Sequence, residues 1–160
     1  TEYLIQPVCQ AFVPSQRLPE HRIYLIVDNY YSSMRKEEVR IFRERADAFF
    51  DTAIYNFEKR RFDLAAFNVE QAVQLYVKTK LLELTGEFPR THNLVILLKE
   101  LSEFFKKEEI EDFRRENMGM LTKLADEYLT SRYYIRDFYE EEVKEILEFA
   151  PKIKRLLGYD

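Results

Sequence analysis

The chain has 160 residues, of which 46% are hydrophobic, 34% are charged and only three are glycine. This length fits one domain with a hydrophobic core, and this balance is typical of a helix-rich globular protein rather than a disordered one. The formal net charge of −4 argues against broad, sequence-independent binding to nucleic acid. A local basic patch is still compatible with this charge. The single cysteine, Cys9, excludes an internal disulfide and a cysteine metal cluster.

The distribution of apolar residues argues against a membrane protein. No apolar run approaches the ~20 residues that a membrane span needs. The first residues also lack the basic start and the apolar run of a signal peptide. A single cysteine fits a reducing compartment. We therefore expect a cytoplasmic protein that does not bind membranes.

Residues 1–33 are predicted to form a non-helical arm. Three of the five prolines fall in the first twenty residues, and a helix cannot run through them. Short β-rich segments at residues 3–5 and 23–27 leave room for a small β-hairpin. Polar residues at 28–33 then break this pattern and can cap a helix. We place a domain boundary here, with an arm over 1–33 and a helical bundle over 34–160.

From Met34 onward the apolar residues follow steps of three and four, which is the spacing of one helix face. A first helix is predicted to end at the basic segment 59–61. A second runs from Phe62 to a stop at Gly86, since glycine readily adopts the left-handed conformation of a helix end. Thr91 is predicted to be the N-cap of a third helix.

The remainder of the chain is predicted to add two more helices. Residues 106–117 are charge-dense, and we expect them to be a solvated connection. Apolar residues at 121–128 indicate a fourth helix, and those at 138–157 indicate a fifth. Amphipathic helices joined by short loops predict an all-α fold, a four-to-five-helix up-and-down antiparallel bundle.

Common catalytic motifs are missing from the sequence. There is no glycine-rich phosphate loop, no His-Glu-x-x-His and no nucleophile elbow. With two histidines and one cysteine, a nucleophile has few bases that could activate it. We therefore predict no catalytic residue, no metal site and no cofactor.

Glu70, Gln74 and Lys78 form the first of three polar groups that merit attention. Their spacing of four places them in a line on the second helix. They are either a solvated or inter-helix polar stripe, or a polar seam that faces a ligand or a second subunit.

Arg90 and His92 form the second group, at the predicted start of the third helix. Free N–H groups and the positive end of the helix dipole make such a position suitable for an anion. In the alternative interpretation, His92 only packs against a neighbouring helix or bonds to a carbonyl.

Asp126, Arg132 and Tyr133 belong to the third group, between the fourth and fifth helices. Arginines among tyrosines can bind a phosphate and stack on a base. Equally, Asp126 and Arg132 can form a surface ion pair while the tyrosines belong to the core.

Taken in chain order, these segments resemble the HEPN domain, a helical family named for nucleotide binding in higher eukaryotes and prokaryotes. The resemblance runs from about Phe42 to Leu157 and leaves the arm outside it. Four short segments carry most of it: 61–67, 70–78, 89–94 and 126–133. Gln74 departs from the family, in which a glutamate is common at this position.

The resemblance implies a helical bundle, commonly a homodimer, that acts with a small nucleotidyltransferase partner in a two-component, toxin–antitoxin-like system. Our first hypothesis is a module that binds a nucleotide, RNA or another phosphate-bearing ligand, or that partner protein. We expect Lys78 and Arg132 to neutralise phosphate, His92 to donate a hydrogen bond and Tyr133 to stack. Contacts from Glu70, Gln74, Arg90 and Asp126 complete the predicted ligand site.

Some family members are metal-independent ribonucleases, in which a histidine follows an arginine by four to six residues. In this chain Arg90 precedes His92 by only two positions, and Arg17 precedes His21 by four but lies in the arm. No histidine follows Arg114 in the required range. A toxin-like ribonuclease with an unusual arginine–histidine arrangement is therefore the alternative, and a purely structural dimerisation protein is the third hypothesis.

Overall fold

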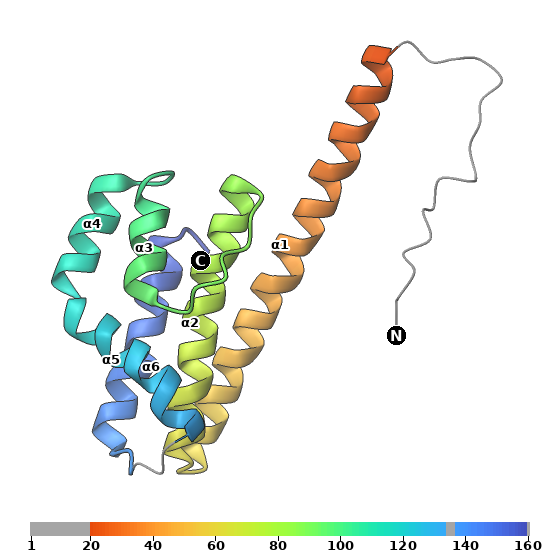
Figure 1. The fold of residues 1–160 in the computed structure, drawn as a ribbon. Coiled ribbons are helices and arrows are strands. Elements are labelled where there is room, and N and C mark those ends of the chain that lie inside the picture. The colour runs from red at the N-terminus through yellow and green to blue at the C-terminus, as the bar shows by residue number, and fades with distance from the viewer. Residues whose placement is uncertain (1–19, 134–136, 160) are drawn as a thin grey trace. The chain divides into compact units, whose positions relative to one another are not determined.

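The computed structural model describes the backbone of residues 20–133 and 137–159 and the side chains of residues 28–125 and 137–159. Across the described backbone the regular structure is helical, with no strand, which confirms the predicted all-α fold. The helices are α1 (Glu20–Glu58), α2 (Phe62–Thr85), α3 (Leu94–Ser102), α4 (Lys107–Glu116), α5 (Met118–Tyr133) and α6 (Glu140–Leu156) (Figure 1). The chain forms two compact units, residues 1–34 and residues 35–160.

Helix α1 begins earlier than the sequence suggested. Its first residue is Glu20, so the prediction of a non-helical arm or β-hairpin is wrong for residues 20–33. The β-rich segment at 23–27 misled the prediction, because β-branched residues each disfavour a helix by less than about 1 kcal/mol. No proline or glycine follows within α1 to stop it. Residues 1–19 lie outside the described residues, and the domain boundary at 33/34 stays a prediction.

The ends of α1 and α2 fall where local sequence signals placed them. After α1, Arg60 adopts the left-handed conformation with φ of 58°, and the Arg61 N–H donates to the Asn56 carbonyl at 2.8 Å. After α2, Gly86 adopts φ of 80° and its N–H donates to the Leu82 carbonyl at 2.9 Å. These bonds satisfy carbonyls that a helix end otherwise leaves without partners.

The start of α3 is capped by a different residue from the predicted one. The side-chain oxygen of Asn93, not that of Thr91, accepts hydrogen bonds from the N–H groups of Val95 and Ile96, at 2.9 and 3.2 Å. Both residue types are good caps, so the choice depends on where the chain turns into the helix. Thr91 instead accepts a bond from the Asn93 N–H at 3.3 Å, within the loop.

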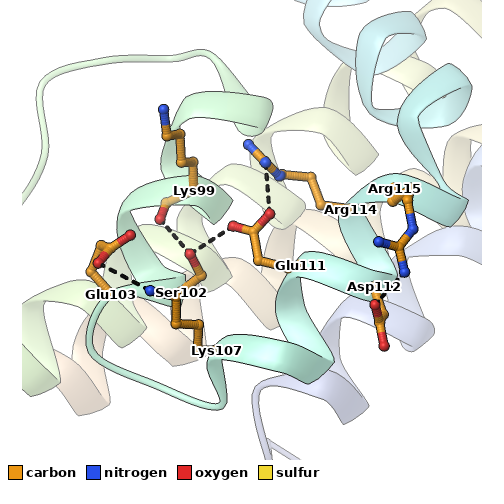
Figure 2. A network of polar contacts seen from close by, with 8 residues as sticks. All are labelled: Lys99, Ser102, Glu103, Lys107, Glu111, Asp112, Arg114 and Arg115. Carbon is orange, nitrogen blue, oxygen red and sulfur yellow. Dashed lines mark hydrogen bonds and ion pairs between the residues drawn. The ribbon is translucent and has the colours of Figure 1, made fainter.

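Helix α4 replaces the predicted solvated connection over 106–117. Ile110 is fully buried and Phe113 packs against the core, so these two residues form a short apolar face among the charges. The Ser102 hydroxyl donates to a Glu111 carboxylate oxygen at 2.8 Å and joins α3 to α4 (Figure 2). The prediction missed this helix because its apolar face is short, within only ten residues that are mostly charged.

Helix α2 lies at the centre of the 35–160 unit. It packs against α3, α5 and α6, and residues 35–58 of α1 run beside it (Figure 1). Asp47 of α1 accepts hydrogen bonds from the Tyr76 hydroxyl of α2 at 2.5 Å and from Lys154 Nζ of α6 at 2.7 Å. A single carboxylate therefore connects three helices. In the described part of the chain, every helix is too short or too polar to cross a membrane.

Candidate functional site

The polar stripe of α2 is buried. Glu70, Gln74 and Lys78 are 0%, 5% and 5% exposed, so the interpretation as a solvated stripe does not hold. Burial of ionisable groups costs free energy unless charges and hydrogen bonds compensate for it. The stripe is therefore a polar seam inside the bundle, and the partners of each group decide what it can do.

Hydrogen bonds join this stripe to the loop before α3. The Gln71 amide nitrogen donates to one oxygen of Glu70 at 2.6 Å, and the Gln74 amide nitrogen donates to the other. The Gln74 carbonyl oxygen lies 3.1 Å from Nδ1 of His92. The structure thus brings His92 of the second polar group onto Gln74 of the first.

A pocket of about 310 Å³ opens beside this seam. α1 contributes Phe42 and Arg45, α2 contributes Gln74 and Lys78, and the loop after α2 contributes Phe88 and His92. This loop places Phe88 on Phe42 of α1 and His92 on Gln74 of α2, which closes one side of the pocket. Loops held by a rigid scaffold are frequent places for binding residues.

The two cations of the pocket, Arg45 and Lys78, each lie over an aromatic ring. Phe42 and Phe88 stack with their ring centroids 4.7 Å apart and an interplanar angle of 27°. The Arg45 guanidinium carbon lies 5.6 Å from the Phe42 centroid, and Lys78 Nζ lies 5.5 Å from the Phe88 centroid. The electron-rich ring faces attract both cations and restrict where their charges lie.

Lys78 has no counter-ion in direct contact among the side chains that the structure describes. Burial lowers the pKa of the Lys78 ammonium, and the negative charge of Glu70 opposes this only in part. Among the residues that the structure describes, none forms a hydrogen bond or an ion pair with Lys78. Lys80, two residues further along α2, pairs with Glu83 at 2.9 Å. Lys78 is therefore a buried cation that faces an open pocket.

A family model of the HEPN domain matches residues 39–158. The chain belongs to the HEPN family. This confirms the resemblance drawn from the sequence between Phe42 and Leu157. A search among curated proteins found no match.

The other predicted site residues of this HEPN domain lie away from the pocket or outside the described side chains. Arg90 is exposed in the loop and is not among the described residues that line the pocket. Asp126, Arg132 and Tyr133 belong to α5, but their side chains lie outside the described residues. Their role as ligand contacts stays a prediction.

Sequence reasoning missed Arg45, Phe42 and Phe88 as pocket residues. Phe42 follows the apolar spacing of α1, which favours a core position rather than a binding site. Arg45 belongs to none of the motifs that the sequence singled out. The contact of Phe88 with Phe42 depends on the path of the loop, and no local sequence pattern predicts it.

The arginines of α4 are already engaged within the HEPN domain. Arg114 pairs with Glu111 at 2.7 Å, and Arg115 pairs with Asp112 at 2.5 Å (Figure 2). These side chains stand where the sequence suggested looking for the ribonuclease arginine. Each guanidinium group forms an ion pair with a carboxylate of its own helix. Neither arginine is therefore an isolated positive charge.

Proposed function

We propose that this HEPN domain binds a phosphate-bearing ligand, such as a nucleotide, in the pocket beside Lys78. The observation that carries the proposal is Lys78 itself, which is 5% exposed, lines the pocket and has no hydrogen bond or ion pair to any described residue. A buried ammonium is stabilised when an anion pairs with it. A phosphate supplies that charge together with strong hydrogen-bond acceptors.

Arg45 is the second cation in this proposal. Its guanidinium lies over Phe42, and Phe42 stacks on Phe88, whose ring holds Lys78. Two positive charges suit a phosphate monoester, which carries about −1.5 to −2 at pH 7. Phe88 is 38% exposed and offers an aromatic edge to the ring of a nucleotide. Arg90, Asp126, Arg132 and Tyr133 stay proposed as further ligand contacts.

We further propose a homodimer that acts with a nucleotidyltransferase partner in a toxin–antitoxin-like system in the cytoplasm; the homodimer and the partner are what the resemblance to the family implies. Light scattering of the purified chain measures the oligomeric state. Co-expression of the chain with a candidate nucleotidyltransferase, followed by pull-down, measures the partnership. A strictly monomeric chain that captures no such enzyme would contradict this part of the proposal.

The pocket itself is tested by thermal shift and calorimetric titration with AMP, ATP, GTP and a short RNA. A ligand at a hundred times its dissociation constant stabilises the fold by about 2.7 kcal/mol, which both methods detect. We expect Lys78→Met to abolish binding. Lys80→Met is the matched control, because Lys80 lies on the same helix, already pairs with Glu83 and does not line the pocket.

Three outcomes would replace or change this proposal. RNA cleavage that His92→Ala abolishes would make the chain a ribonuclease, which is the alternative activity in the family. If the folded protein neither binds these ligands nor cleaves RNA, the remaining hypothesis is a structural dimerisation protein. Binding that survives Lys78→Met would place the ligand site elsewhere on the domain.

A further inference from the structure

We infer that Gln74 is a positioning residue that holds His92 in the tautomer protonated on Nδ1, with Glu70 holding Gln74 in turn. The inference rests on the proposed function in one respect, since His92 lies in the wall of the pocket to which the ligand is assigned. Its consequence is that a neutral His92 does not donate a hydrogen bond to the ligand phosphate.

The Glu70 carboxylate is completely buried, and each of its oxygens accepts a hydrogen bond from a side-chain amide. An ionised carboxylate only accepts hydrogen bonds. The two amide groups that contact it, those of Gln71 and Gln74, must therefore turn their NH₂ groups towards it.

The orientation of one amide then determines the histidine. With its NH₂ group on Glu70, Gln74 presents its carbonyl oxygen to Nδ1 of His92, at 3.1 Å. A carbonyl oxygen cannot donate, so Nδ1 must carry the proton. In a neutral imidazole the second nitrogen, Nε2, is then unprotonated and acts only as an acceptor.

This relay changes the role that the sequence suggested for His92. We expected His92 to donate a hydrogen bond to the ligand, but its Nδ1 proton is directed to Gln74. Neutralisation of the phosphate is left to Lys78 and Arg45, which are held over Phe88 and Phe42. Gln74 and Glu70 thus affect the ligand through the ring they orient, rather than by contact with phosphate.

Nitrogen-15 NMR of the full chain tests the tautomer directly, because the protonated and unprotonated ring nitrogens have well-separated chemical shifts. His21 is the other histidine, and His21→Gln assigns the signals. Above the pH at which the ring becomes neutral, we expect Nδ1 of His92 to be protonated. A protonated Nε2 would overturn the inference, because it would mean that the Gln74 amide has the opposite orientation.

Two variants test whether Gln74 is the cause. Gln74→Met removes the acceptor, and we expect His92 to shift towards the Nε2-protonated tautomer that predominates in free histidine. AMP affinity should not fall, because the parent His92 does not donate to the phosphate and the Nε2-protonated ring can. An unchanged tautomer in the folded Gln74→Met variant would show that something other than Gln74 orients the ring.

The second variant exchanges the two groups of the relay. Glu70→Gln together with Gln74→Glu preserves an amide-to-carboxylate hydrogen bond and presents an acceptor oxygen to His92. We expect this double variant to keep Nδ1 protonated, whereas loss of that tautomer would contradict the relay. Failure of AMP binding in the parent protein, with the Nδ1 tautomer present, would sink the proposed function and leave this inference intact.

Discussion

Asp47 connects three helices, and we expect Asp47→Ala to lower the free energy of unfolding by about 2 kcal/mol. Most of this cost comes from Tyr76, which is 1% exposed and would keep a buried hydroxyl without its acceptor, a loss of about 1–3 kcal/mol. The Lys154 pair adds less than about 1 kcal/mol, because both side chains are a third or more exposed and water screens their charges.

A double-mutant cycle separates these two contributions. Urea unfolding followed by circular dichroism gives the stability of Asp47→Ala, Tyr76→Phe and the double variant. In the Tyr76→Phe background, Asp47→Ala should cost less than about 1 kcal/mol, because only the exposed Lys154 pair is left to lose. Glu44→Ala, an exposed acid on the same helix, is the control and should change stability by less than about 0.5 kcal/mol. An equal cost of Asp47→Ala in both backgrounds would refute the role assigned to Tyr76.

The same carboxylate predicts a pH dependence. Partial burial opposes ionisation of Asp47, but hydrogen bonds from Lys154 and Tyr76 outweigh it, and the pKa of Asp47 is lowered in the folded state. A lowered pKa means that the stabilisation is present above the ordinary value, about 3.9, and is lost as the pH falls through the folded value. The stability difference between parent and Asp47→Ala should therefore be constant above about pH 5 and shrink below about pH 4.

Two further predictions test the ends and the core of the bundle, both by urea unfolding. Asn93→Ala should cost about 1 kcal/mol because it removes the cap of α3, whereas Thr91→Ala should cost less than about 0.5 kcal/mol. The opposite order would restore Thr91 as the cap. Ile110→Ala should cost about 3 kcal/mol because its side chain is fully buried. A cost below about 0.5 kcal/mol would mean that α4 is a solvated segment after all.

Some parts of the fold could be predicted because their signals are local. Helix α2 ends at Gly86 because glycine adopts a positive φ without steric cost. The apolar spacing of α2 and α6 likewise falls on residues that the structure buries, such as Val73 and Ile146. The predictions failed where local signals were mixed, as in α4, whose Ile110 is surrounded by charges.

The candidate site was predicted only in part for a related reason. Glu70, Gln74 and Lys78 could be grouped because a helix places residues four apart on one line. Their burial, and the bond from His92 to Gln74, depend on a loop that folds back over α2. Arg45 comes from a different helix, and no spacing in the sequence relates it to Lys78.

The sequence by itself determined that this chain is all-helical and that it belongs among the HEPN domains, since helix periodicity and short ordered segments are properties of neighbouring residues. Only the tertiary structure decided that Lys78 is a buried cation facing a pocket and that Gln74 bonds to His92. Burial and cross-helix contacts arise from residues far apart in the chain. Their free energies therefore depend on packing rather than on local pattern.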